Sequence, residues 1–286
     1  MRLAIIGLGL IGGSFARALR VAGAVTHISG YDLDATQRRL AVDLGVVDAA
    51  PDNAAEAIRE ADVVVLAVPV LHTAQALTAV LSALKPGTVV TDVGSTKQSV
   101  LADVAAVCGG IPSWFVAGHP IAGTEKSGVA ASSAELFRGK RMILTPHPQQ
   151  DPAAFATVHR LWEAAGARVV EMDAARHDTI FAATSHLPHV LAYAFVDMLA
   201  HSEAHEEIFA NAGGGFRDFT RIASSNPEMW HDIVRANQQS VACLLKQQIA
   251  GLQTLLGQIE AGQWAALKAS FERARAARER HLAQIE

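Results

Sequence analysis

The sequence predicts an α/β domain built on a mostly parallel, doubly wound sheet, followed by an all-α domain. Two patterns carry this prediction: short apolar runs alternate with helical segments in the first part of the chain, and strand-like runs end after about Met172. Apolar runs rich in valine and isoleucine are typical of strands buried on both faces, and their alternation with helices is typical of parallel sheets. The runs occupy residues 3–6, 28–31, 63–68, 89–93, 114–117, 142–144 and 169–170.

The second part of the chain has the periodicity of helices. Apolar residues recur there at steps of three and four, which marks one face of a helix. Because the pattern changes near Met172, we expect an α/β domain at residues 1–172 and a helical domain at residues 173–286. The two apolar stripes comprise Val241, Leu244, Leu245, Ile249, Leu252, Leu255, Leu256 and Ile259, and then Trp264, Leu267, Phe271 and Ala274.

Composition argues against several classes of protein. Of the 286 residues, 50% are hydrophobic and 18% are charged, and the net charge of −4 comes without the basic patch of a nucleic-acid binder. The two cysteines, Cys108 and Cys243, lie far apart, which argues against a disulfide framework. Glycines interrupt the first apolar stretch, unlike a signal peptide, and no uncharged apolar run reaches the ~20 residues that span a bilayer. We therefore expect a cytoplasmic protein that binds neither nucleic acid nor membrane.

A glycine motif follows the first predicted strand directly. Residues 7–12 read Gly-Leu-Gly-Leu-Ile-Gly, and the strand before and the apolar helix after them give the context of a dinucleotide-binding Rossmann domain. In that context the first glycine makes a tight turn, the second admits the pyrophosphate and the third lets helix and strand pack closely. The alternative is a structural turn without a ligand. We expect cofactor contacts at Gly7, Gly9, Leu10, Ile11 and Gly12.

Asp32 stands 20 residues after Gly12, at the end of the second predicted strand. A carboxylate there accepts hydrogen bonds from the adenosine ribose and repels a 2′-phosphate. Arg38 and Arg39 could soften this repulsion, but we expect them on an exposed helix. The pattern favours NAD, with NADP as the less favoured alternative.

Polar residues stand where three later strands end, and ligands of open α/β sheets bind at that edge. Val68 and Pro69 end the third run and are expected to border the cofactor. His119, after the fifth run, is the candidate general base, because imidazole titrates near ~6.5; a capping or packing histidine is the alternative. After the fourth run, Ser95 is a cap or a site residue, and we interpret Asp92 as a helix cap.

Four segments resemble one enzyme family. Residues 118–128, GHPIAGTEKSG, closely resemble the signature loop of prephenate dehydrogenases. Residues 185–189 (SHLPH), 213–223 (GGGFRDFTRIA) and 227–230 (PEMW) also resemble that family and follow in its order. The likeness extends over nearly the whole chain, so the sequence is similar to the prephenate/arogenate (cyclohexadienyl) dehydrogenases.

The resemblance implies an NAD-dependent oxidative decarboxylation of prephenate to 4-hydroxyphenylpyruvate, of arogenate to tyrosine, or of both, in tyrosine biosynthesis. It makes His119 the catalytic histidine at the ring hydroxyl, Ser95 a second contact to that hydroxyl beside the cofactor, and Arg221 the ligand of the ring carboxylate. It also implies a homodimer through the helical domain, and tyrosine is a candidate inhibitor at the active site. The resemblance places five further residues at the substrate pocket or its gate: His189, Glu125, Thr124, Arg217 and Trp230.

Several alternatives stay open at this point. His186 and His189 stand three apart on a predicted helix, but two histidines without a third ligand are weak evidence for zinc, and we expect no metal. For Arg217 the alternative is a simple ion pair with Asp218 or a neighbouring acid. A β-hydroxyacid dehydrogenase, with Lys246 as the lysine of its helical half, and a non-catalytic NAD-binding redox sensor are the alternative functions.

Overall fold

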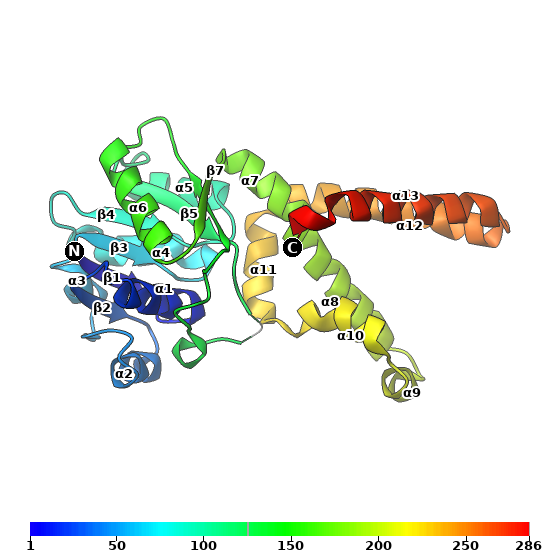
Figure 1. Cartoon of the computed structure of the whole chain (residues 1–286), viewed down its shortest axis with the longest axis horizontal. Coiled ribbons are helices and arrows are strands. Elements are labelled where there is room, and N and C mark those ends of the chain that lie inside the picture. The colour runs from blue at the N-terminus through cyan, green and yellow to red at the C-terminus, as the bar shows by residue number, and fades with distance from the viewer. Residues whose placement is uncertain (125, 286) are drawn as a thin grey trace. The chain divides into compact units, whose positions relative to one another are not determined.

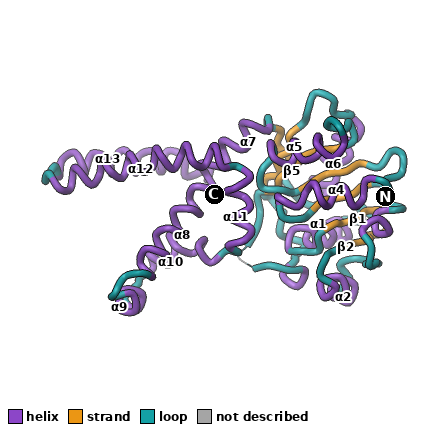
Figure 2. The backbone as a smooth tube through the Cα atoms, turned by 180° about the vertical axis from the view of Figure 1, so that it is seen from behind, coloured by secondary structure: helices purple, strands orange, loops and turns teal. Residues whose placement is uncertain are grey.

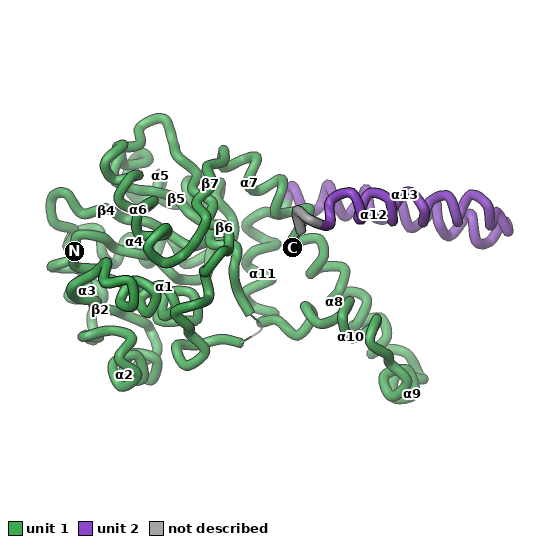
Figure 3. The backbone as a smooth tube through the Cα atoms, in the orientation of Figure 1, with its two compact units in different colours: residues 1–238 green, residues 239–286 purple. Residues whose placement is uncertain are grey.

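The computed structural model of the chain describes residues 1–124 and 126–285. It divides into two compact units, residues 1–238 and residues 239–286 (Figure 3). The first unit holds a seven-stranded sheet in the order β2-β1-β3-β4-β5-β6-β7 (Figure 1). The strands are β1 (Arg2–Ile6), β2 (His27–Tyr31), β3 (Val63–Leu66), β4 (Val89–Asp92), β5 (Phe115–Pro120), β6 (Arg141–Thr145) and β7 (Arg168–Glu171).

The pairing of the strands confirms the predicted fold class. Strands β1 to β5 run parallel, whereas β6 pairs antiparallel with β5 and parallel with β7. The strand order reverses at β1, because the chain passes from β1 to β2 on one side and later places β3 on the other. Loops leave the carboxyl ends of β1 and β3 in opposite directions at such a reversal, and this opens a crevice for ligands.

Both faces of the sheet are buried, as the apolar runs predict. Along β1, Leu3 and Ile5 join one hydrophobic cluster and Ala4 and Ile6 join the other, because successive side chains of a strand point to opposite faces. Helices cover both faces of the sheet (Figure 2). They are α1 (Leu10–Val21), α2 (Ala35–Asp43), α3 (Ala54–Ile58), α4 (Thr73–Leu81), α5 (Gln98–Cys108) and α6 (Pro152–Ala164).

After β7 the described chain is helical, as predicted. Helix α7 (Ala174–Phe181) continues through one π-helical turn, Ala182–His186, into α8 (Leu187–Ala200). Helices α9 (His205–Ala210) and α10 (Gly214–Thr220), a short 3₁₀ turn η4 (Arg221–Ser224) and α11 (Pro227–Ala236) complete the first unit. The domain boundary near residue 172 stays a prediction; the compact units divide after residue 238.

The second unit is made of two long helices, α12 (Gln238–Glu260) and α13 (Trp264–Ile285). The apolar stripes predicted from the sequence lie on them. Many of their large side chains are exposed in the single chain: Ile249, Leu252, Leu256, Ile259, Trp264 and Phe271.

One helical run, Ala174–Ala200, is long and apolar enough to cross a bilayer, judged by length and composition alone. This run carries three buried polar side chains, His177, Asp178 and His186. They form hydrogen bonds with other elements of the first unit, as described below, and this is the behaviour of a helix inside a folded domain.

Candidate active site

The glycine turn between β1 and α1 is shaped as a dinucleotide cradle. Gly7 has a φ of +103°, and a Cβ added to it would lie 2.3 Å from the carbonyl oxygen of Ala67. A Cβ on Gly12 would lie 2.2 Å from the carbonyl oxygen of Gly7, so this helix and the turn pack too closely for any side chain. Gly9, in contrast, faces open space, and no side chain caps the N-terminus of α1. The turn therefore has room and free N–H groups for a pyrophosphate.

Asp32 lies beside this turn, after β2. Its Oδ2 accepts a hydrogen bond of 2.8 Å from the backbone N–H of Leu8, which fixes the carboxylate at the rim of the cradle. Arg38 is not on an exposed helix face as predicted: its side chain is half-buried, donates to the carbonyl oxygen of Asp32 at 2.7 Å and pairs with Asp52 at 2.5 Å. Arg39 is exposed, as predicted. A guanidinium already paired with a carboxylate is poorly placed to bind a 2′-phosphate, so this geometry also suits NAD.

A buried ion pair joins the ends of β4 and β5. Asp92 accepts from the backbone N–H of Gly94 at 2.7 Å and of Gly118 at 3.0 Å, and it forms an ion pair with Lys97. Lys97 is fully buried and also donates to the carbonyl oxygen of Gly118 at 2.5 Å. The prediction that Asp92 caps a helix is therefore wrong, because its carboxylate is used to lock the strand ends together. The residue that follows Gly118 is His119, so this ion pair fixes the backbone beside the candidate base.

The N-terminus of α5 is capped from a distant part of the chain. Asp178, on α7, accepts from the backbone N–H groups of Lys97 at 2.7 Å and Gln98 at 2.9 Å. The same carboxylate accepts from His177 Nδ1 at 2.8 Å, and His177 Nε2 lies 2.9 Å from His119 Nδ1. His119, His177 and Asp178 thus form one hydrogen-bonded chain from the end of β5 to the start of α5.

The surroundings of this chain keep its histidines neutral. Burial is the main reason that the pKa of His119 lies well below that of free imidazole, and its proximity to the ionisable groups His177, Lys97 and His186 lowers it further. The pKa of His177 is also lowered by burial, although the bond to Asp178 opposes that effect. Burial raises the pKa of Asp178, but the hydrogen bonds that it accepts from His177 and from two backbone N–H groups bring it below its ordinary value. His119 is therefore unprotonated at neutral pH and able to accept a proton.

A second group of side chains continues from this chain. The Asn237 amide donates to the carbonyl oxygen of Asp178 at 2.8 Å and lies 3.3 Å from His186 Nδ1. His186 is buried, and burial lowers its pKa to about 4. Its Nε2 and the Nε1 of Trp230 are buried without a hydrogen-bond partner among the described residues. Two buried N–H groups of this kind call for an acceptor from outside the chain, such as a ligand or water.

His189 lies against Trp230, and Arg221 lies near His189. The His189 ring stacks on Trp230 with centroids 3.4 Å apart, and its Nδ1 is bonded to the carbonyl oxygen of Ser185 at 2.8 Å. Burial lowers the pKa of His189, and the nearby Arg221 guanidinium lowers it further. Arg221 itself is exposed, at the start of η4.

The other predicted site residues are spread around this region. Val68 and Pro69 follow β3, and Ser95 is half-buried in the loop after β4. Thr124 is exposed in the loop after β5, and Glu125 lies outside the described residues. Arg217 is 81% exposed and lies 3.7 Å from Asp218, as the ion-pair alternative anticipated.

Sequence reasoning missed His177, Asp178, Lys97 and Asn237. Apart from the pairs Asp92–Lys97 and His177–Asp178, their side-chain contacts described above join residues that are 21 or more positions apart. No spacing rule identifies such contacts; the one signal available was an adjacent histidine and aspartate just after the last predicted strand. Among the described residues there is also no group of three or more His, Cys, Asp or Glu side chains that could hold a metal ion.

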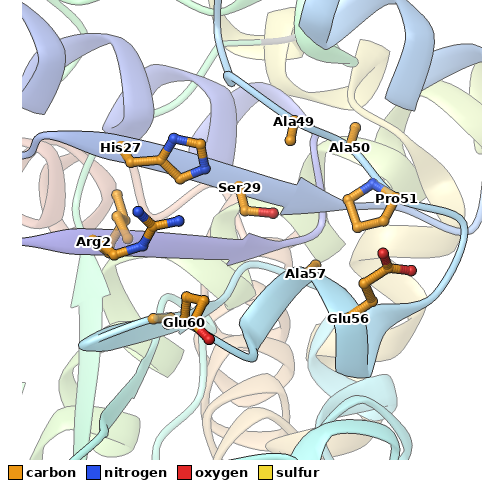
Figure 4. Close-up of a pocket in the computed structure, with 11 residues that line it drawn as sticks. Arg2, His27, Ser29, Ala49, Ala50, Pro51, Glu56, Ala57 and Glu60 are labelled. Carbon is orange, nitrogen blue, oxygen red and sulfur yellow. The ribbon is translucent and has the colours of Figure 1, made fainter.

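A surface pocket of about 370 Å³ lies elsewhere, at the amino-terminal ends of β1 and β2 (Figure 4). Arg2, His27, Ser29, Glu56 and Glu60 are among the residues that line it. Ligands of parallel α/β sheets bind at the opposite, carboxyl-terminal edge, where the glycine turn and His119 lie. We therefore assign no part of the candidate active site to this pocket.

Comparison with known proteins agrees with this geometry. The nucleotide-binding domain of prephenate dehydrogenase matches residues 15–171, and the dimerization domain of prephenate dehydrogenase matches residues 173–273. The cyclohexadienyl dehydrogenase of Zymomonas mobilis is 39% identical over 256 residues, which cover 88% of this chain and 86% of that protein. The prephenate dehydrogenase of Bacillus subtilis is 40% identical over 241 residues, which cover 83% of this chain and 64% of that protein.

A solved structure extends the likeness to three dimensions. The prephenate dehydrogenase of Aquifex aeolicus, crystallised with hydroxyphenyl propionate and NAD+, has a TM-score of 0.91 and 37% sequence identity, with 98% of each chain covered. Two domain matches in order and similarity over nearly the full length point to one family. This chain belongs to the prephenate dehydrogenase family.

Proposed function

We propose that this NAD-dependent dehydrogenase catalyses the oxidative decarboxylation of prephenate, arogenate or both. One observation carries the proposal: in a member of this family, a neutral histidine stands at the edge of the sheet that also holds a dinucleotide cradle. The reaction removes a hydride from the ring carbon that bears the hydroxyl and carbon dioxide from the opposite ring carbon. Aromatisation supplies much of the driving force, so the protein contributes positioning and proton management.

The cofactor side of the site is built from backbone. Residues Gly7 to Gly12 and the uncapped N-terminus of α1 would hold the pyrophosphate, with Leu10 and Ile11 in the first turn. Asp32 would bind the ribose, while Val68 and Pro69 border the cofactor after β3. NAD supplies the hydride acceptor when it is bound.

His119 is the proposed general base. It would accept the proton of the ring hydroxyl as carbonyl character develops there, and its low pKa keeps it ready to do so at neutral pH. Ser95, in the loop beside it, would contact the same hydroxyl and orient it. Both roles require that His119 and Ser95 lie within hydrogen-bond distance of the hydroxyl when the substrate is bound, since catalytic hydrogen bonds tighten in that complex.

Arg221 is the proposed ligand of the ring carboxylate. A guanidinium suits this role because it can bind a carboxylate with two parallel hydrogen bonds. The same interaction stabilises the group that must later leave as carbon dioxide, so its value lies in binding and orientation rather than in bond cleavage. Its proximity to His189 supports a place in the pocket.

The remaining pocket residues are proposed from their surroundings. Since Nδ1 of His189 is bonded to a backbone carbonyl, its other ring nitrogen is left for the substrate, with Trp230 stacked on the ring. Thr124 and Arg217 are exposed and would act at the entrance, and Glu125 is assigned there by resemblance alone. Tyrosine would compete for this pocket because it carries the phenol ring of either product and is itself the product of arogenate.

The assembly is proposed to be a cytoplasmic homodimer. The helical part of the chain matches a dimerization domain, and helices α12 and α13 expose large apolar side chains in the single chain. Apolar surface of this kind is typical of an interface. Light scattering would test this proposal, and a monomer mass at micromolar concentration would contradict it.

The experiment for the activity follows NADH formation with purified protein. Prephenate and arogenate are supplied in parallel, each with NAD and with NADP, and the products are identified by chromatography. We expect NADH with at least one of the two substrates and a large preference for NAD. Absence of turnover with both, or turnover of simple β-hydroxyacids instead, would overturn the proposal.

A further inference from the structure

We propose that His177 and Asp178 are positioning residues that hold His119 in the tautomer whose Nε2 is free to accept a proton. Asp178 fixes His177, and His177 fixes His119, through hydrogen bonds of 2.8 Å and 2.9 Å. The inference rests on the proposed function, because it needs His119 to be the base. It adds two buried residues outside the family-like segments described above.

This series of hydrogen bonds starts at Asp178, whose carboxylate stays charged. Asp178 accepts hydrogen bonds from the backbone N–H groups of Lys97 and Gln98, from the side chain of Gln98 at 3.5 Å and from His177. Two of these donors form the N-terminus of α5, whose partial positive charge also favours an anion. The carboxylate is 1% exposed, so water does not compete for these bonds.

The charge state of Asp178 decides the tautomers of both histidines. A carboxylate only accepts hydrogen bonds, so His177 must donate to it from Nδ1. A neutral imidazole carries one N–H, so His177 Nε2 is an acceptor, and His119 must donate to it from Nδ1. The remaining nitrogen of His119, Nε2, then holds a lone pair and is the atom that can act as a base.

Packing keeps this geometry rigid. Phe181, one turn further along α7, contacts both rings, with centroids 5.1 Å from that of His119 and 4.5 Å from that of His177. His177 is fully buried and Phe181 is 6% exposed. A rotation of the His119 ring would break its bond to His177 and disturb this contact, so the structure favours one orientation.

The surrounding charges show why the hydrogen bond to His177 helps His119 to accept a proton. His119 faces three cationic or potentially cationic groups, Lys97, His177 and His186, all of which oppose a second proton on its ring. His177 faces Asp178, Lys97 and Asp92. Asp92 is already paired with Lys97, so Asp178 remains to offset the charge that develops on His119, acting through His177. When the hydroxyl proton reaches Nε2, the Nδ1 proton stays in the bond to His177 and that bond becomes charge-assisted and stronger.

Two substitutions at one position separate this role from simple packing. In His177→Gln the side-chain oxygen can take the place of Nε2 and still accept from His119, whereas His177→Leu fills the volume without an acceptor. We expect kcat of His177→Leu to fall about 10- to 100-fold, the factor for loss of a hydrogen bond to a charged group. We expect His177→Gln to recover most of that loss and KM to change little in either variant.

The pH dependence of kcat/KM distinguishes a positioning role of His177 from a packing role, because a packing role alone would leave it unchanged. His119 has a lowered pKa, so its base form persists below the range of free imidazole, and kcat/KM falls as the pH drops through the lowered value. His177 is neutral in this range because its own pKa is lowered. Without an acceptor for Nδ1–H the protonated form of His119 loses a stabilising bond. The acid limb of His177→Leu should therefore move to lower pH, and that of His177→Gln should stay near the wild type.

His147→Gln is the matched control. His147 is a buried histidine whose described hydrogen bond is to the carbonyl oxygen of Phe115 at 3.1 Å rather than to His119, His177 or Asp178. It should keep wild-type kinetics even if it lowers the melting temperature. Equal losses in His177→Leu and His177→Gln, or an acid limb that stays in place or rises in His177→Leu, would overturn the inference. Wild-type protein without turnover on either substrate would instead refute the proposed function.

Discussion

The cofactor turn and the histidine chain are built in opposite ways. The turn is a local structure: Gly7, Gly9 and Gly12 lie within six residues, and each has a separate steric role that follows from the backbone alone. The histidine chain is assembled from β5 and α7, and its ends meet across 58 and 81 residues of sequence. Local motifs therefore indicate a cofactor site, whereas the surroundings of the proposed base depend on contacts that a single sequence does not display.

The largest effect is expected at the base itself, where the distant contacts converge. His119→Asn should lower kcat by about 10²- to 10⁴-fold with little change in KM, because a proton acceptor is lost while a polar side chain remains. Steady-state kinetics at neutral pH would measure this. Near-wild-type kcat would remove His119 from the role of base and with it the reason for the chain behind it.

The turn can be tested by two alanine substitutions that differ only in steric surroundings. Gly7→Ala meets the carbonyl of Ala67 and a φ of +103°, so it should destabilise the fold by about 1–3 kcal/mol or more. Gly9→Ala meets no atom within 4 Å, so its melting temperature should stay unchanged. Its KM for NAD should instead rise about tenfold, which corresponds to ~1.4 kcal/mol of lost binding. Thermal melts and NAD titration would show whether the two effects separate; equal melting temperatures would contradict this account of the turn.

The difference between local and long-range contacts explains which features of the molecule could be predicted from the sequence. The strand runs, the class of the sheet and the helical second part follow from periodicity, because that periodicity reflects burial on one or both faces. Asp92 shows the limit of such sequence patterns. An acidic residue after a strand suggests a helix cap, but the carboxylate of Asp92 forms a buried ion pair with Lys97 instead. The true cap of α5 is Asp178, and nothing near Gln98 in the sequence points to it.

A substitution of Arg221 tests the proposed binding of the substrate's ring carboxylate. Arg221→Ala should raise KM for prephenate or arogenate about 10- to 100-fold, the range for a hydrogen bond to a charged group, with a smaller fall in kcat. Initial-rate kinetics with varied substrate at saturating NAD would measure both constants. A large fall in kcat with unchanged KM would place this guanidinium at the transition state rather than at the bound carboxylate.

Arg217 gives the smallest expected effect and is a direct counterpart of Arg221. It belongs to the same family-like segment as Arg221, yet it is 81% exposed and lies 3.7 Å from Asp218, and exposed pairs of this kind contribute at most ~1 kcal/mol. Arg217→Ala should therefore change KM by less than about fivefold and leave the melting temperature unchanged. The two alanine variants are matched, because both remove an exposed arginine from neighbouring turns. If Arg217→Ala raised KM as much as Arg221→Ala, both guanidiniums would bind the substrate, and the family-like segment would be a better guide to the pocket than the contacts of the single chain.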